Sequence, residues 1–214
     1  MARMKDVLES LRAWDEAGLA SAEAVLVGAQ HSSPRQPGAR LAVNEKGQAA
    51  GAVSMGCVEN DLREHMLGLL RGGGGARMLH YGAAFEAALE VGLSCGGEID
   101  VWIHRHDSAS PAWRAVQALA PTARAILLTR LAERSEQLLW RPGEPLPAPE
   151  MAEKLAELWT RGGAGQIRAA GDKWFAETLA PDPLLLIVGA SPIAVELCAM
   201  AARTGFRVAV VDPR

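Results

Sequence analysis

The chain opens with apolar residues at helical spacing and then changes to strand patterns. The helical positions are Met4, Val7, Leu8, Leu11 and Trp14. Gly18 follows them as a stop, so this pattern predicts one amphipathic helix. Residues 24–30 form a short apolar run and predict a strand. Residues 31–38 hold two prolines and a glycine, which predicts a loop.

The next segment predicts a hairpin that leads into a helix. Residues 40–44 and 48–53 flank the turn 45–47. From Val58 the apolar positions return to helical spacing and end before four glycines, 72–75. The residues Ser54-Met-Gly-Cys57 are therefore expected at a strand-to-helix junction.

The middle of the chain continues the alternation of helices and strands. Strands are expected at 77–81 and 98–104, a short helix at 83–90, and a hairpin at 165–179 around Gly171-Asp172. His104 and His106 alternate at a strand end, a pattern typical of surface positions. Residues 141–150 hold four prolines and are expected to form an internal linker.

The last residues resemble the opening of a dinucleotide-binding fold. A strand at 184–188 is followed by Gly189-Ala-Ser-Pro-Ile-Ala194, a helix at 193–204 and a strand at 207–211. Asp212 follows Gly189 by 23 residues, close to the spacing of a ribose-binding acid. Ser191 replaces the glycine nearest the pyrophosphate, so NAD(P) binding is not favoured, and a simple tight turn at Gly189 is the alternative. Gly189, Ser191 and Asp212 remain candidate cofactor-binding residues.

The predicted fold class is α/β. We expect an N-terminal cofactor-binding domain at 1–107, a middle segment at 108–180 with the proline-rich linker, and the first strand-helix-strand of a Rossmann-like domain at 181–214. Two parallel strands and one helix cannot bury both faces of a parallel sheet. Either the chain belongs to a longer protein, or a second subunit completes the sheet in a homo-oligomer.

Composition narrows the function classes. The 214 residues carry 22 Lys and Arg against 25 Asp and Glu, a net charge of −3, without basic blocks that would favour nucleic acid as a partner. No apolar run approaches the length of a membrane span, and the charged N-terminus is unlike a secretory signal, so a cytoplasmic location is expected. Three cysteines are too few and odd in number for a disulfide scaffold.

Glycines surround two of these cysteines. Cys57 follows Gly56 where a helix is expected to begin, and both the helix dipole and free backbone N–H groups favour a thiolate there. Cys95 lies in Leu-Ser-Cys-Gly-Gly. Arg35 and Arg40 could add bidentate contacts to a phosphate or carboxylate. A buried structural role for either thiol is the alternative. Zinc is not favoured because the chain holds no CxxC motif.

Three ordered motifs resemble those of the XdhC/CoxI family, the accessory proteins of xanthine dehydrogenase and carbon monoxide dehydrogenase. They are Ser33-Pro-Arg-Gln-Pro-Gly-Ala39, Gly51-Ala-Val-Ser-Met-Gly-Cys-Val-Glu59 and Gly92-Leu-Ser-Cys-Gly-Gly-Glu98. The resemblance implies a chaperone that binds the molybdenum cofactor, in its molybdopterin or a dinucleotide form. Such proteins protect the cofactor and help its sulfuration and insertion. The implied partners are a xanthine dehydrogenase type molybdoenzyme and a cysteine desulfurase.

The resemblance carries over to individual residues. It implies cofactor-binding roles for Ser33, Arg35, Gly38, Ser54, Gly56, Cys57, Glu59, Cys95, Gly96 and Gly97. Thiolates are soft ligands, so Cys57 and Cys95 are the candidates for contacts to the molybdenum centre. Glu59 is expected to stabilise the helix start or to hydrogen-bond a pterin edge. Met55 departs from the glycine that the family usually has, which restricts the backbone of the loop.

Two other function classes stay open. The enzyme alternative is a nucleotide-dependent thiol oxidoreductase that uses Cys57 or Cys95 as nucleophile. It would consume NAD(P)H over many turnovers, whereas the chaperone would bind molybdopterin stoichiometrically without turnover. The third alternative is a scaffold that only docks onto a target enzyme and whose cysteines are structural. The resemblance favours an accessory protein over an enzyme.

Overall fold

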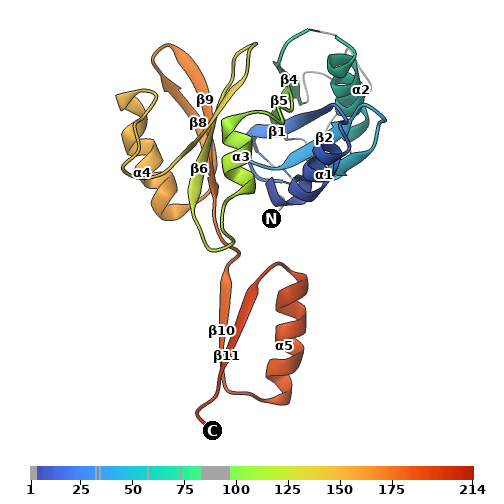
Figure 1. Ribbon diagram of the computed structural model, residues 1–214. Coiled ribbons are helices and arrows are strands. Elements are labelled where there is room, and N and C mark those ends of the chain that lie inside the picture. The colour runs from blue at the N-terminus through green and yellow to red at the C-terminus, as the bar shows by residue number, and fades with distance from the viewer. Residues whose placement is uncertain (1–3, 32, 34, 57, 73, 83–96) are drawn as a thin grey trace. The chain divides into compact units, whose positions relative to one another are not determined.

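The structure is a computed structural model that describes residues 4–31, 33, 35–56, 58–72, 74–82 and 97–214 (Figure 1). The chain divides into two compact units. Unit 1 comprises Met1–Leu119 and Arg124–Leu179, and unit 2 comprises Ala120–Ala123 and Ala180–Arg214. The proline-rich segment predicted as a linker lies inside unit 1, where Ala148 and Met151 are buried in a core.

Unit 1 contains two antiparallel sheets. Sheet A has the order β3-β2-β1-β5-β4, and sheet B has the order β7-β6-β9-β8. The strands of sheet A are β1 (Ser21–Gln30), β2 (Arg40–Asn44), β3 (Ala49–Gly51), β4 (Arg77–Tyr81) and β5 (Glu98–Arg105). Those of sheet B are β6 (Ala125–Arg130), β7 (Glu136–Trp140), β8 (Ala164–Ala169) and β9 (Asp172–Leu179). The helices are α1 (Met4–Glu16), α2 (Glu59–Leu70), α3 (Pro111–Gln117), the 3-10 helix η2 (Pro149–Met151) and α4 (Ala152–Arg161).

Alternation along β1 explains how the layers stack. Ala22, Ala24 and Leu26 pack in the core beneath α2, which buries Leu62, Met66 and Leu69 against sheet A. Val25 and Val27 point to the other face, where they pack with Trp102 of β5 and Phe175 of sheet B. Apolar residues of α1 and α3 fill the remaining space between the sheets, and α4 covers the far face of sheet B. Sheet A is therefore enclosed on both faces.

Most predicted elements are confirmed. The hairpins of β2 with β3 and of β8 with β9 form, and Ile99, Val101 and Ile103 share one buried face of β5 as expected. The helix predicted at 83–90 lies outside the described residues. The expectation that His104 and His106 are surface residues is wrong, because both side chains are enclosed between sheet A and its neighbours.

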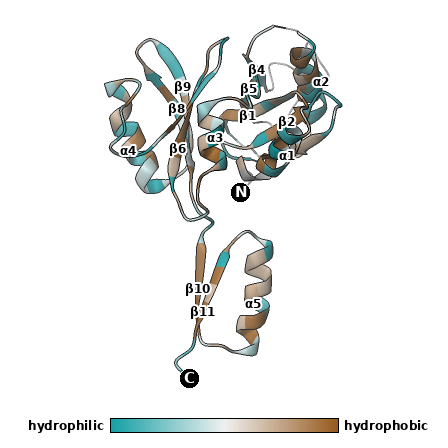
Figure 2. Cartoon of the chain, in the orientation of Figure 1, coloured by the Kyte–Doolittle hydropathy of each residue, from teal (hydrophilic) through white to brown (hydrophobic). Residues whose placement is uncertain are grey.

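Unit 2 is a small parallel unit. The strands β10 (Leu184–Val188) and β11 (Arg207–Val211) pair in parallel and are joined by the helix α5 (Pro192–Arg203). This is the predicted strand-helix-strand, and the sheet described here has two strands, short of a full Rossmann unit. Its strands are strongly apolar (Figure 2), yet Leu184, Leu186 and Val188 are more than half exposed. The fold as a whole is mixed α/β with mostly antiparallel sheets, and the parallel arrangement expected at this end is limited to β10 and β11.

The two sheets of unit 1 are tied together by a buried ion triad. Arg40 of β2 is fully buried and donates from Nη1 to Glu23 Oε2 of β1 at 2.9 Å and from Nη2 to Glu177 Oε1 of β9. Both carboxylates are also almost fully buried. Burial raises the pKa of Glu23, but Arg40 and the nearby histidines outweigh it and hold that pKa well below its usual value. The triad is therefore charged.

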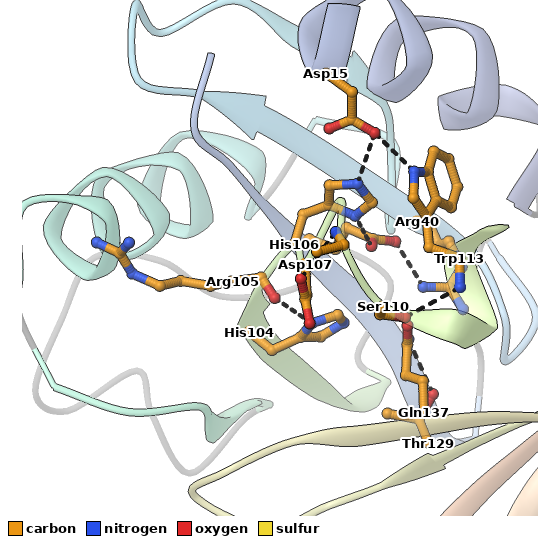
Figure 3. A network of polar contacts seen from close by, with 12 residues as sticks. Asp15, Arg40, His104, Arg105, His106, Asp107, Ser110, Trp113, Thr129 and Gln137 are labelled. Carbon is orange, nitrogen blue, oxygen red and sulfur yellow. Dashed lines mark hydrogen bonds and ion pairs between the residues drawn. The ribbon is translucent and has the colours of Figure 1, made fainter. Parts of the chain in front are cut away.

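His106 extends this network toward α1 (Figure 3). Its Nδ1 lies 3.1 Å from Glu23 Oε1 and its Nε2 lies 3.3 Å from Asp15 Oδ2. Both partners are carboxylate oxygens that only accept, so both ring nitrogens donate and the imidazole is protonated. Burial lowers the pKa of His106, but these two carboxylates outweigh it and raise the pKa above 6.5. Trp113 packs edge-on against the ring and donates from Nε1 to Asp15 at 2.7 Å.

We predict that Arg40→Met destabilises unit 1 by about 3–5 kcal/mol, because it leaves two buried carboxylates without their shared cation. Urea unfolding measures the change. Adding Glu177→Gln to Arg40→Met should recover part of the loss, since one of the two buried charges is then removed. A loss below about 1 kcal/mol for Arg40→Met would contradict the charged triad.

We also predict that His106 stabilises the fold more at low pH than at high pH. A raised folded pKa contributes stability that is complete below the unfolded value of 6.5 and is lost as the pH rises through the folded pKa. The free energy of unfolding of wild type minus that of His106→Asn should therefore be larger at about pH 6 than at about pH 9. His104, whose pKa is lowered mainly by burial and to a smaller extent by the charge of His106, is present in both proteins, so the larger part of its opposite effect cancels. A difference that does not change with pH would show that folding does not raise the pKa of His106, and a difference that grows with pH would show that His106 is held neutral in the folded state.

Candidate functional site

The segments that carry the three motifs leave sheet A at the same end. β1 ends at Gln30, which pairs with Glu98 at the start of β5. β3 ends at Gly51, which pairs with Leu41 near the start of β2. β4 ends at Tyr81, which pairs with Ile99 of β5. Because all these pairs are antiparallel, the ends of β1, β3 and β4 and the starts of β2 and β5 lie at one end of the sheet, which we call the motif end.

The first motif forms a turn against the middle of β1. Ser33 donates from Oγ to the carbonyl of Arg35 at 2.8 Å, and both residues are partly buried. Gly38 has a φ of +97° and donates its N–H to Leu26 of β1 at 2.8 Å. A Cβ at Gly38 would lie 3.5 Å from Glu177 Oε2. Gly38 therefore lies close to the same carboxylate that pairs with Arg40.

Arg40 is not available to a ligand in this arrangement. Its guanidinium has no exposed surface, and Nη1 and Nη2 are committed to Glu23 and Glu177. A phosphate that reached it would leave two buried carboxylates unpaired, which costs several kcal/mol. The sequence predicted Arg40 as an anion contact, whereas the structure uses it to join two sheets.

Glu59 folds the second motif into a tight loop. Its Oε1 accepts from the N–H of Ser54 at 2.7 Å and of Val53 at 3.2 Å. Its Oε2 accepts from Ser54 Oγ at 2.7 Å and from the N–H of Gly56 at 2.9 Å. Burial raises the pKa of Glu59, but the hydrogen bonds from Ser54 and Gly56 outweigh it and lower that pKa. All four acceptor positions of the carboxylate are thus occupied.

We call these four hydrogen bonds the Glu59 clasp. They bear on the two roles that the sequence suggested for Glu59. The carboxylate reaches back from the first residue of α2 and organises the loop, while Val58 at the N-cap makes no side-chain cap. The Glu59 carboxylate has no remaining acceptor position for a hydrogen bond from a pterin edge. In this arrangement Glu59 stabilises the loop of the second motif.

The loop tip is open to solvent. Met55 is 76% exposed, and a Cβ at Gly56 would meet nothing within 4 Å. Gly56 has a φ of +108°, a backbone conformation that favours glycine. Ser54 is buried by contrast, because its hydroxyl and N–H both face Glu59. The backbone at Gly56 is therefore accessible to a ligand that approaches from solvent.

Three predicted residues, Cys57, Cys95 and Gly96, lie outside the described residues. Gly97, which follows them, is buried at the start of β5. In the described part of the chain no three His, Cys, Asp or Glu side chains are grouped so as to hold a metal ion. The helices that the structure describes include none long and apolar enough to cross a bilayer.

The glycine turn of unit 2 satisfies its own donors. Gly189 has a φ of +105°, and Ser191 caps α5 by accepting from the N–H of Ala194 at 3.3 Å. Asp212 Oδ2 accepts from the N–H of Ala190 at 2.6 Å, and Arg214 donates to the same carboxylate. The hydrogen bonds from Arg214 and Ala190 lower the pKa of Asp212. Two of the N–H groups that a pyrophosphate could use are therefore already taken.

A cavity of about 540 Å³ lies beside this turn. Its lining is mostly apolar and includes Pro192, Val195, Cys198 and Val210. Cys198 is half-buried, and among the described residues it is the free cysteine. This cavity presents few polar groups that could fix the orientation of a cofactor.

The sequence patterns did not predict the roles of several polar residues that pack around sheet A. Glu23 interrupts an apolar strand, and a carboxylate there requires a buried partner. Asp61 and His65 have helical i, i+4 spacing, and Tyr81 is the single tyrosine of the chain. These patterns identify polar residues that need partners, but they do not say which partners.

We predict that Glu59→Gln destabilises the protein by about 1–2 kcal/mol, because one carboxylate oxygen that accepts from N–H groups is replaced by an NH₂ donor. A lowered folded pKa gives stability that is present above 4.5 and is lost as the pH falls through the folded value. The stability difference between wild type and Glu59→Gln should therefore shrink in acid. Urea unfolding at neutral and acid pH measures this stability difference. An equal difference at the two pH values would contradict a charged Glu59 carboxylate that is stabilised by these hydrogen bonds.

Comparison with known proteins supports the N-terminal motifs. Residues 14–82 match the model of the XdhC and CoxI family. The fold matches a crystal structure described as a xanthine dehydrogenase from Bacillus halodurans, with a TM-score of 0.67 and 20% sequence identity. The match covers 100% of this chain and 63% of that protein, so the chain spans less than two thirds of its length. At this identity the likeness concerns the fold. The curated proteins include no match to the sequence.

The family match covers the first two motifs, the strands β1 to β4 and helix α2. These are the elements that place the loops 31–39 and 52–58 at one end of sheet A. The similarity to the XdhC and CoxI family thus covers residues 14–82 of this 214-residue chain.

Proposed function

We propose that this chain is an accessory protein of molybdoenzyme maturation that binds the molybdenum cofactor at the motif end of sheet A. The observation that carries the proposal is the antiparallel register, which brings the strand ends that flank the three motifs to one end of the sheet. The open loop tip at Met55 and Gly56 supports it, since a ligand could reach the backbone there. The family match supports a role in the maturation of a molybdoenzyme.

The contact set follows from the chemistry of the motifs. Cys57 and Cys95 would supply thiolates, which are soft ligands suited to a molybdenum centre. The backbone at Gly96-Gly97, together with Ser33 and Arg35, would hold the phosphate, and the carbonyl of Gly56, whose N–H is bonded to Glu59, would accept from the pterin. When bound, the cofactor supplies the molybdenum centre that the mature enzyme uses. Arg40 is left out of this set because it is paired and buried.

Later steps follow from the same proposal. A cofactor held by two thiols is shielded from oxidation and can be presented to a cysteine desulfurase and then to an apo-enzyme of the xanthine dehydrogenase type. Unit 2 would contribute a Rossmann-like unit, which its parallel crossover and glycine turn support. Its apolar strands, more than half exposed at several positions, favour contact with further protein, such as a second copy of the chain.

Cofactor binding is the direct test. The purified chain is mixed without oxygen with molybdenum cofactor released from a denatured molybdoenzyme, and retained molybdenum and pterin are measured after ultrafiltration. We predict that the wild type retains both in a fixed ratio to protein, and that Cys57→Ser and Cys95→Ser each weaken retention by about tenfold or more, as expected for the loss of a ligand. Cys198→Ser, in unit 2, serves as the matched control and should bind like the wild type.

Other outcomes distinguish the alternatives. Equal retention by the wild type and by a variant lacking both Cys57 and Cys95 would overturn the thiol contacts and support a docking scaffold. Repeated consumption of NAD(P)H that stops when the thiols are alkylated would support an oxidoreductase. The internal pairing of Ala190 with Asp212 weighs against that second outcome.

A further inference from the structure

A line of polar contacts joins α2 to β4, from Tyr81 at the motif end of sheet A to Arg77 at the start of the strand. Tyr81 donates from its hydroxyl to Asp61 Oδ2 at 2.6 Å. The same oxygen lies 3.6 Å from Nε2 of His65, whose Nδ1 lies 3.4 Å from Nη2 of Arg77. Two residues of one strand face thus meet two residues of one helix face. We call Asp61, His65, Arg77 and Tyr81 the α2–β4 seam.

The direction of each hydrogen bond in the seam can be assigned. An arginine only donates, so His65 Nδ1 accepts from Arg77 and Nε2–H faces Asp61. Burial, the hydrogen bond to Asp61 and the charges of Asp61 and Glu59 all raise the pKa of Tyr81. Its hydroxyl therefore stays protonated and remains a donor. Tyr81 is 3% exposed, so water does not easily replace Asp61 as its acceptor.

The Tyr81–Asp61 bond connects the stems of two motifs. Asp61 lies in the first turn of α2, two residues after Glu59, whose carboxylate holds the loop of the second motif. Tyr81 is the last residue of β4, at the point where the chain leaves the sheet toward the third motif. The position of one stem relative to the other depends on how α2 lies along β4.

Apolar packing alone does not set that position. Leu62 and Met66 of α2 are fully buried against sheet A, and this burial attaches the helix. Hydrophobic attraction is not directional, so it tolerates a small slide or rotation of the helix. A hydrogen bond of 2.6 Å between two side chains that are largely enclosed is directional and does not.

We infer that Tyr81 and Asp61 are positioning residues of the proposed cofactor site: their hydrogen bond sets the spacing between the stem of the second motif, at the start of α2, and the end of β4, from which the chain leads to the third motif. This inference rests on the proposed function. Neither side chain need touch the cofactor. Loss of the bond would leave the fold intact and weaken a ligand that must contact both motifs at once.

The variant Tyr81→Phe removes the hydroxyl and keeps the ring. Its matched control is Thr178→Val, which removes another buried hydroxyl, one that donates to the carbonyl of Leu158 at 2.9 Å in the sheet B layer. Both variants lose one hydrogen bond and should lose similar stability. Only Tyr81→Phe should weaken cofactor retention, by about three- to tenfold, the range expected for one lost hydrogen bond.

Variants of Asp61 separate position from charge. Asp61→Asn keeps an oxygen that accepts from Tyr81 and should retain binding within about twofold, whereas Asp61→Ala should match Tyr81→Phe. The double variant Tyr81→Phe with Asp61→Ala should bind no worse than either single variant, since both remove the same bond. Equal losses in Asp61→Asn and Asp61→Ala would show that charge matters, and would overturn the inference.

A second readout does not use the cofactor. In a Cys198→Ser background, a short thiol cross-linker such as dibromobimane should join Cys57 to Cys95 in the wild type and in Thr178→Val, and more slowly in Tyr81→Phe. An equal rate and equal cofactor retention in Tyr81→Phe and wild type would overturn the positioning role. A wild type that neither cross-links nor retains cofactor would instead refute the proposed function.

Discussion

Arg40 carries a full charge into the space between two sheets, where a lone ion would cost many kcal/mol. It is tolerated there because Glu23 comes from its own sheet and Glu177 from the other, so the charge is shared only when both sheets are in place. The guanidinium fork suits two carboxylates that approach from different strands, which a lysine could not match. The middle segment is therefore part of the same folded unit as the motif-bearing sheet.

Hydrogen bonds at the two ends of α2 connect the candidate site to sheet A and to the loop of the second motif. At its C-terminus, Arg105 of β5 donates to the carbonyls of Leu69 and Leu70, groups that no helical N–H can reach. At its N-terminus, Glu59 satisfies N–H groups of the preceding loop. The helix is thus attached to sheet A by Arg105 at its C-terminal end and by its apolar face, and Glu59 attaches the loop of the second motif to its N-terminal end. A loop held in this way is ordered before any ligand arrives, which lowers the entropic cost of binding.

Unit 2 differs from unit 1 because it leaves apolar side chains exposed and pairs its polar groups internally. A parallel pair of strands with one helix covers one sheet face, and apolar side chains such as Val188 and Ile193 are left more than three quarters exposed. Exposed apolar area of this kind favours contact with further protein. Meanwhile its glycine turn is closed by Asp212 and Ser191, so the polar groups of the turn are satisfied internally. The exposed surface of unit 2 thus favours protein contact over nucleotide binding.

The local patterns of the sequence determined the strands, the hairpins, α2 and the presence of glycine-rich motifs, because hydrophobic periodicity depends on neighbouring residues. The motifs also indicated a resemblance to the XdhC and CoxI family, and the family match confirms it over residues 14–82, which hold the first two motifs. The roles of individual polar residues were decided by tertiary structure. Arg40 and Glu177 are 137 residues apart, and Tyr81 and Asp61 meet across a strand and a helix. Periodicity says which side of an element is buried, but sheet order and register decide which charged groups meet there, and these arise only when distant segments pack.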